Sequence, residues 1–203
     1  MTGLLPLDSG QIMVDDKEVS FKGPKDAEEH GISFIHQEMN NFAEMTVLEN
    51  MFLNKEEKTG FGLINDKGMR AKAESIFNTL NINYDLDTPV GNLSVGAQQM
   101  IEISKAMMTD AKVIIMDEPT AALTRSEIRS LFETVNHLKS RGVSFIYISH
   151  RIEENMEIAD KITIMRDGHT VSESKIVDTS VAEIVKNMVG RDIGEFYPDR
   201  HPN

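Results

Sequence analysis

An acidic pair follows an apolar run in the middle of the chain. Residues 113–116 are apolar, and Asp117 and Glu118 come directly after them. Adjacent carboxylates behind a buried strand are unfavourable unless a cation or a water molecule uses them. The pair suits phosphoryl transfer to water, in which one carboxylate holds Mg²⁺ and the other polarises the attacking water. We therefore predict a hydrolytic site here, with an exposed acidic turn as the alternative.

Two further polar groups follow predicted strands. Gln37 comes after an apolar run that ends at Ile35, and His150 after one that ends at Ile148. Ligands of an open parallel sheet bind beyond the carboxyl ends of its strands, so Gln37, Glu118 and His150 are expected to meet at one crevice. Taken singly, each is better explained as an ordinary turn residue, because polar residues are common where strands end.

The elements that must position these groups follow from the apolar pattern. Short β-rich runs alternate with longer helical patterns, which predicts an α/β domain with a largely parallel sheet. Residues 11–14 and 18–21 flank Asp15-Asp16-Lys17 and predict an N-terminal antiparallel hairpin. Apolar residues recur at helical spacing from Thr46 to about Ile82 and again after Ser94. A helical subdomain over residues 40–108 is therefore predicted to be inserted in the α/β domain.

The clearest helix signal lies after the acidic pair. Thr124 and Glu127 have the spacing of a capping box, and Gly142 stands where a C-terminal cap is expected. Strands are predicted at residues 143–148 and 162–165, the second turning into 170–173. A last helix is predicted to open at residue 180, and the tail 191–203 is interpreted as a linker.

Composition excludes several classes of function. The 203 residues are 40% hydrophobic, enough to bury a core, and no apolar run approaches the roughly 20 residues of a membrane helix. The absence of cysteine excludes disulfides and thiolate chemistry. A net charge of −12 argues against nucleic acid as a partner, since binding to phosphates requires a clustered basic face.

The order and spacing of four segments resemble the nucleotide-binding domain of ABC transporter ATPases. Residues 113–119 resemble its Walker B segment, 93–96 its signature motif, 35–38 its glutamine loop and 149–151 its histidine switch. The likeness covers essentially the whole chain and is greatest to the ATPases of ribose-type monosaccharide importers. It implies a single P-loop NTPase-like domain over residues 1–203. It also implies the function of the family, which is ATP hydrolysis coupled to sugar import.

The resemblance implies ATP and Mg²⁺ as cofactors and assigns roles to the polar groups. Asp117 and Gln37 would contact Mg²⁺, and Gln37 would also sense the attacking water. Glu118 would activate that water, and His150 would contact the γ-phosphate of ATP.

The resemblance also divides the site between two domains. Ser94, Val95 and Gly96 would bind ATP held by a second nucleotide-binding domain, since the N-terminus of a helix offers free N–H groups to a phosphate. Ala97 replaces the glutamine usual in the signature, which weakens part of this contact. The other implied partners are permease subunits in the membrane and, indirectly, a sugar-binding protein. The implied location is the cytoplasm, peripheral on the inner face of the cell membrane.

One expected motif is missing from the sequence. The 203 residues contain no Gly-x-x-x-x-Gly-Lys-[Ser/Thr] segment and no Gly-Lys dipeptide. Residues 2–4 resemble the end of the helix that follows the phosphate loop, so the first strand and this loop are expected to be absent. Two alternatives to a transport ATPase stay open, namely a non-catalytic truncated fragment and a soluble ABC ATPase with no link to transport.

The first prediction concerns nucleotide affinity. A chain without the backbone cradle and lysine of a phosphate loop should bind Mg-ATP weakly or not at all. Isothermal titration of the 203-residue chain with Mg-ATP measures this affinity. Tight binding would contradict the prediction.

Overall fold

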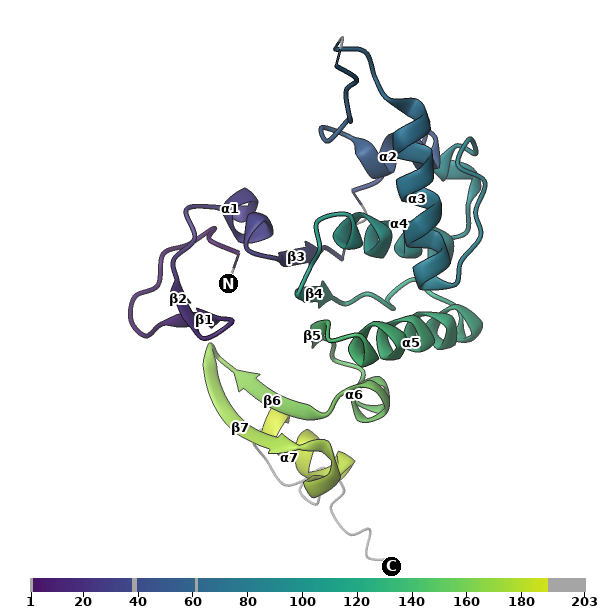
Figure 1. Cartoon of the computed structure of the whole chain (residues 1–203). Helices are drawn as coiled ribbons and strands as arrows, with labels where there is room; N and C mark the ends of the chain where they lie inside the picture. The colour runs from purple at the N-terminus through teal and green to yellow at the C-terminus, as the bar shows by residue number, and fades with distance from the viewer. Residues whose placement is uncertain (1, 38–39, 61, 190–203) are drawn as a thin grey trace, which may run out of the picture. The chain divides into compact units, whose positions relative to one another are not determined.

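The computed structural model describes residues 2–37, 40–60 and 62–189, which form two compact units that divide after Ile148. The first unit contains β1 (Ile12–Val14), β2 (Lys17–Val19), α1 (Pro24–Glu29), β3 (Ile32–Ile35), α2 (Val47–Phe52), α3 (Asp66–Leu80), η1 (Val90–Asn92), α4 (Val95–Met107), β4 (Val113–Asp117), α5 (Arg125–Ser140) and β5 (Ser144–Ile148) (Figure 1). The second contains α6 (Ile152–Ile158), β6 (Lys161–Arg166), β7 (His169–Lys175), η2 (Ile176–Asp178) and α7 (Val181–Val189).

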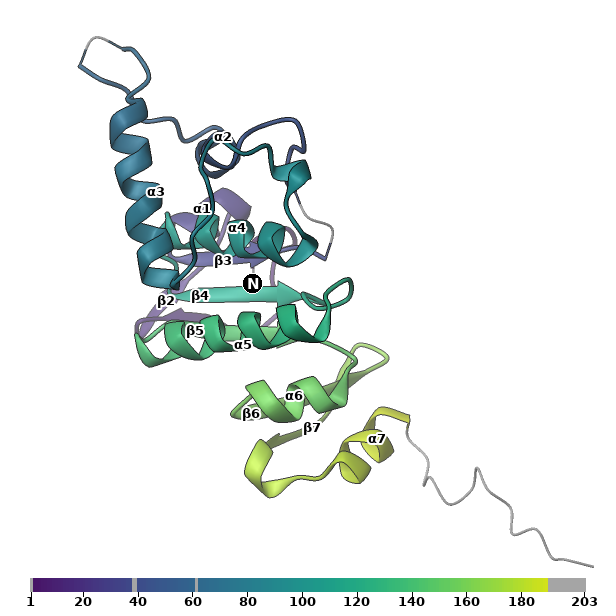
Figure 2. The same ribbon diagram turned by 90° about the vertical axis from the view of Figure 1, so that its right-hand side faces the viewer.

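The sheet of the first unit has the order β3-β4-β5, and all three strands are parallel. Helices α4 and α5 lie on one face, and α1 and the β1-β2 hairpin lie on the other side (Figures 1 and 2). Ile114 and Met116 of the central strand are fully buried. The predicted α/β fold with a parallel sheet is therefore confirmed, and the strand before the acidic pair extends to Asp117 itself.

The N-terminal hairpin forms as the sequence predicts. Strands β1 and β2 are antiparallel, with Val14 opposite Lys17. Asp15 and Asp16 have φ of 51° and 59°, which is the left-handed pair that a two-residue hairpin turn requires.

The helical region has its own apolar core, and the predicted run from 46 to 82 is divided into α2 and α3. Both helices pack with α4 around a shared cluster. Its most buried members are Val47, Phe52, Ala73, Val90 and Ile101. Ser94 caps α4 as predicted, since its Oγ accepts a hydrogen bond from the N–H of Ala97 (3.2 Å). The domain limits proposed from the sequence, 1–203 and 40–108, stay predictions.

The second unit is built on an antiparallel pair. Strands β6 and β7 join at Asp167-Gly168, which are both left-handed, with φ of 51° and 79°. Helix α7 packs on them through the buried Ile184. The predicted tail 191–203 lies outside the described residues, and none of the described helices is long and apolar enough to cross a membrane.

A buried asparagine fastens the loop between β3 and α2. The side chain of Asn50 is 1% exposed and accepts a hydrogen bond from the N–H of Phe42 at 2.8 Å. Its amide donates to three carbonyl oxygens at 3.0 Å each, those of Phe42, Met45 and Thr46. One side chain thus bonds four backbone groups at residues 42–46, a role that no sequence signal indicated.

Removal of this side chain should destabilise the first unit. Asn50→Ala leaves the N–H of Phe42 without its hydrogen-bond partner, and an unsatisfied group of this kind costs about 1–3 kcal/mol. The three carbonyls lose one of their two bonds each, because each also accepts from a backbone N–H. We expect a loss of about 1–3 kcal/mol in the free energy of unfolding, measured by urea denaturation. Asn78→Ala is the control, because Asn78 is exposed on α3. Equal unfolding midpoints for the two variants would contradict the role given to Asn50.

Candidate functional site

The acidic pair lies where the central strand turns out of the sheet. Asp117 is the last residue of β4, Glu118 follows it, and both are half-buried. Glu118 has φ of 46° in the left-handed region, and its N–H donates to the carbonyl of Ile148 (2.9 Å). Such a conformation in a residue other than glycine costs about 1–3 kcal/mol and is found mostly at functional sites. No sequence signal marks it.

The parallel register brings the glutamine loop to the same edge of the sheet. Ile35 pairs with Met116, and Gln37 and Glu118 each come two residues later along neighbouring strands. Gln37 is exposed, and residue 38 of the same motif lies outside the described residues. The structure thus positions Gln37 and the acidic pair at the ends of neighbouring parallel strands, while their shared role in a site stays a prediction.

The chemistry of this edge fits Mg²⁺ in one particular way. Mg²⁺ in nucleotide sites takes one or two carboxylates and completes its shell with phosphate oxygens and water. Asp117 and Glu118 supply two carboxylates. Within the ranges that the structure describes, no three His, Asp or Glu side chains gather as metal ligands. The residues present therefore fit a metal that is bound together with a nucleotide.

The first turn of α4 is occupied by a side chain from α5. Oε1 of Glu127 accepts hydrogen bonds from Oγ of Ser94 (2.8 Å) and from the N–H of Gly96 (3.1 Å). A Cβ at position 96 would lie 2.6 Å from Cγ of Glu127. Only glycine at this position leaves room for the carboxylate. Val95, the remaining predicted contact to ATP, is half-buried and begins the helix.

Glu127 is strongly held as an anion. Hydrogen bonds from the backbone N–H and hydroxyl of Thr124, and then from the hydroxyl of Ser94, lower its pKa to about 2. The pKa of Tyr84 is raised, first by burial and then by the negative charge of Glu127. The capping box of Thr124 and Glu127 is confirmed. The same carboxylate also reaches another helix, which the spacing of the capping box does not indicate.

The histidine-switch segment belongs to the second unit. Oγ of Ser149 accepts from the N–H of Arg151 (3.0 Å), and Nδ2 of Asn155 donates to the carbonyl of Ser149 (3.0 Å). Arg151 also pairs with Glu154 at 2.9 Å. His150 is exposed at the start of this unit. Its convergence with Gln37 and Glu118 stays a prediction.

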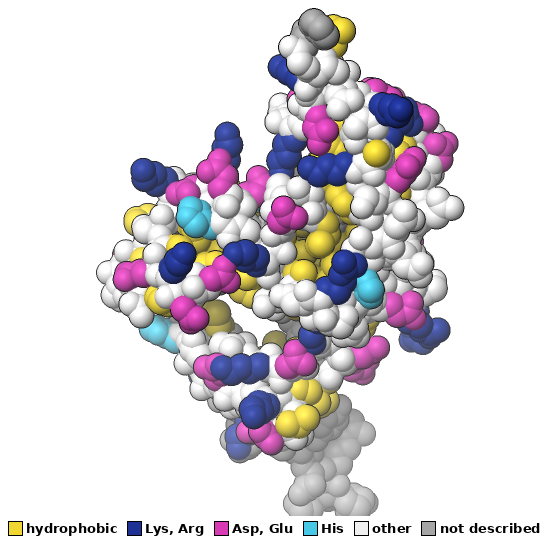
Figure 3. Space-filling view, in the orientation of Figure 1, with side chains coloured by type: hydrophobic (Ala, Val, Ile, Leu, Met, Phe, Trp, Pro, Cys, Tyr) yellow, Lys and Arg dark blue, Asp and Glu magenta, His cyan; other side chains and the backbone are white. Residues whose placement is uncertain are grey.

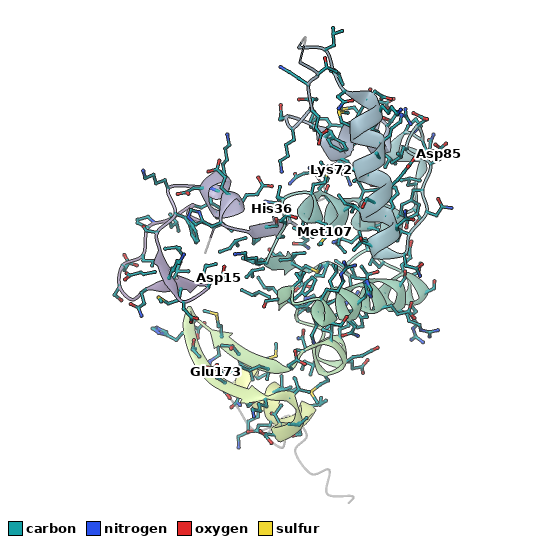
Figure 4. The ribbon with its side chains drawn as sticks, viewed as in Figure 1. Asp15, His36, Lys72, Asp85, Met107 and Glu173 are labelled. Atoms are coloured by element: carbon teal, nitrogen blue, oxygen red, sulfur yellow. The ribbon has the colours of Figure 1, made fainter. Side chains whose placement is uncertain are left out.

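A cavity of about 400 Å³ lies elsewhere in the first unit. Residues of the N-terminal segment, α1, β3 and α4 line it, among them Ile32, Phe34 and Ala106. His36, labelled in Figure 4, also lines it, whereas Asp117 and Glu118 do not. Figure 3 shows apolar side chains at the surface between α1 and α4. The lining of this cavity therefore does not include the acidic pair.

Comparison with known proteins identifies the family. The family described as ABC transporter matches residues 1–121, which is more than half of the chain. This chain belongs to the ABC transporter family. The resemblance drawn from the four sequence motifs is thereby confirmed.

Solved ATP-binding cassettes share the fold of this ABC family member. A nucleotide-free ATP-binding cassette from an ABC transporter is 28% identical, has a TM-score of 0.75, and matches over 93% of this chain and 76% of its own. A cassette in its ADP conformation is 27% identical with the same TM-score, over 97% and 79% of the two chains.

The curated relatives are longer than this chain. The ribose import ATP-binding protein RbsA of Lacticaseibacillus paracasei is 58% identical over all 203 residues. The protein of the same name from Bacillus subtilis is 54% identical over the same length. The chain spans 41% of each of these relatives.

The close approach at Gly96 generates a prediction. Gly96→Ala puts a methyl group against Glu127 and should destabilise the first unit by about 1–3 kcal/mol, as overpacking does. Urea denaturation measures the change. Gly60→Ala is the matched control, because a Cβ there meets nothing within 4 Å.

A double substitution sharpens this prediction. Adding Glu127→Ala to Gly96→Ala removes the clash, so the two effects should be clearly non-additive. Strict additivity would show that the contact between residues 96 and 127 does not limit the space at α4.

Proposed function

We propose that this chain is a nucleotide-binding domain that hydrolyses ATP to drive import of a ribose-like monosaccharide. The observation that carries the proposal is the carboxylate pair at the end of β4, with Glu118 held in a left-handed conformation beside the edge that bears Gln37. The motif order of the ABC family and the names of the curated relatives support the assignment to sugar import.

The residues of the sheet edge divide the work of hydrolysis. The bound cofactors supply the γ-phosphate and the cation that neutralises its charge. Asp117 and Gln37 would hold the cation, Gln37 would also orient the attacking water, and Glu118 would accept a hydrogen bond from that water and polarise it. His150 would contact the γ-phosphate.

Each ATP site is shared between two domains, and this domain also contributes residues to the site of its partner. Ser94, Val95 and Gly96 bind the phosphates of ATP held by a second nucleotide-binding domain, through the free N–H groups of the first turn of α4. The helical region 40–108 and the loop after Gln37 dock on permease subunits, which receive sugar from a binding protein. The domain accordingly works at the cytoplasmic face of the membrane.

A chimera tests this function. The chain replaces the aligned segment of the Bacillus subtilis relative, which keeps its own upstream and downstream residues, in cells that lack the original gene. We expect the chimera to restore uptake of labelled ribose and the purified protein to hydrolyse ATP. Folded chimera without uptake would overturn the sugar assignment.

Two variants of the chimera test the assigned base. Glu118→Gln should lower ATP hydrolysis by this domain about 100-fold or more, as loss of a general base does. Glu133→Gln, exposed on α5, is the matched control and should leave hydrolysis unchanged. Equal rates in the two variants would remove Glu118 from the catalytic role.

A further inference from the structure

We propose that Glu127 is a positioning residue that occupies the phosphate-binding end of α4 in the free domain and must release it when a phosphate arrives. The inference deepens the proposed function, since it rests on the role given there to Ser94 and Gly96. It concerns a residue to which none of the four family motifs assigns a role.

The two carboxylate oxygens of Glu127 do different work. Oε2 completes the capping box of its own helix, where it accepts from the N–H (2.9 Å) and the hydroxyl (2.7 Å) of Thr124. Oε1 leaves α5 and accepts from Oγ of Ser94 and the N–H of Gly96 on α4. One side chain therefore joins the first turns of two helices that are about thirty residues apart in sequence.

The groups that Glu127 engages on α4 are those that a phosphate would use. A backbone N–H and a serine hydroxyl each carry a single hydrogen, so neither can serve a carboxylate and a phosphate oxygen fully at the same time. The first turn of a helix also favours a negative charge, and Glu127 is ionised at neutral pH because its pKa lies at about 2. Glu127 thus has the charge and the position of a bound anion.

The close packing at Gly96 also keeps a phosphate away from this N–H by steric hindrance. The side chain of Glu127 lies against the Cα of Gly96, where even a methyl group would clash. A phosphate that approaches this N–H has to displace the carboxylate.

Release of Glu127 from α4 would also affect the edge of the sheet that carries Glu118. Only eight residues separate Glu118 from Glu127, and two tight turns connect them, in which Ala121 N–H donates to the Glu118 carbonyl (3.2 Å) and Leu123 N–H to the Thr120 carbonyl (3.1 Å). The start of α5 therefore connects the first turn of α4 to Glu118 through a short, hydrogen-bonded segment.

The chain supplies a matched control for this contact. Glu49 forms a capping box with Thr46 at the start of α2, with hydrogen bonds of 2.8 Å and 3.0 Å to its Oε2. Its capping box has the same pattern as that of Glu127, but the hydrogen bonds found for the Glu49 carboxylate are all with Thr46. Substitution of Glu49 therefore measures the loss of a cap alone.

The experiment titrates the 203-residue chain with inorganic pyrophosphate and follows the amide of Gly96 by NMR. We expect Glu127→Gln to bind pyrophosphate about tenfold more tightly at this amide than the unmodified chain, because the competing charge is gone. Glu127→Asp should act in the same direction, since its shorter side chain keeps the cap charge but cannot span both helices. Glu49→Gln should behave like the unmodified chain.

A further variant locates the bound anion. Adding Ser94→Ala to Glu127→Gln should abolish the gain, because it removes one of the two donors. Equal affinity of the unmodified chain and both Glu127 variants would overturn the inference and leave the phosphate role of α4 intact. If the Gly96 amide responds in neither the unmodified chain nor any variant, both the inference and the phosphate role of α4 are overturned. The Glu118 and ribose-uptake results would stand independently.

Discussion

Parallel pairing of β3, β4 and β5 is the constraint on which the rest of the site depends. Since the three strands run in one direction, their carboxyl ends share an edge, and whatever follows them is brought together. The central strand can be held there because it is almost wholly apolar and buried, with Ile114 and Met116 at 0% exposure. Asp117 and Glu118, both half-buried, follow this buried run directly.

The two faces of this sheet are not covered equally. Helices α4 and α5 bury one face (Figure 2). On the other, Phe34, Val113 and Ile146 are only half-buried, and the edge strand β5 leaves Ile148 45% exposed. Parallel sheets are normally covered on both faces and paired at their edges. This face therefore favours contact with further apolar structure.

Local signals in the sequence account for the elements that were predicted. Four apolar residues before Asp117 predict the buried strand, and Ser94 and Thr124 predict helix starts because their side chains cap the first turn. Helices α1 and α6 were missed because six or seven residues are too few to display a helical period. The left-handed Glu118 and the reach of Glu127 to α4 were also missed. Both depend on tertiary contacts that spacing does not encode.

Tertiary contacts from two segments, one after Glu118 and one after Gln37, meet on α4. At its first turn, the carboxylate of Glu127 ties α4 to the segment that follows Glu118. Along its side, Nδ2 of Asn41 donates to the carbonyl of Gln98, and Lys105 donates to Asn41, each at 3.4 Å. Asn41 follows the glutamine loop by a few residues. Contacts from Asn41 and from Glu127 thus converge on one helix, whose first turn carries Ser94 and Gly96.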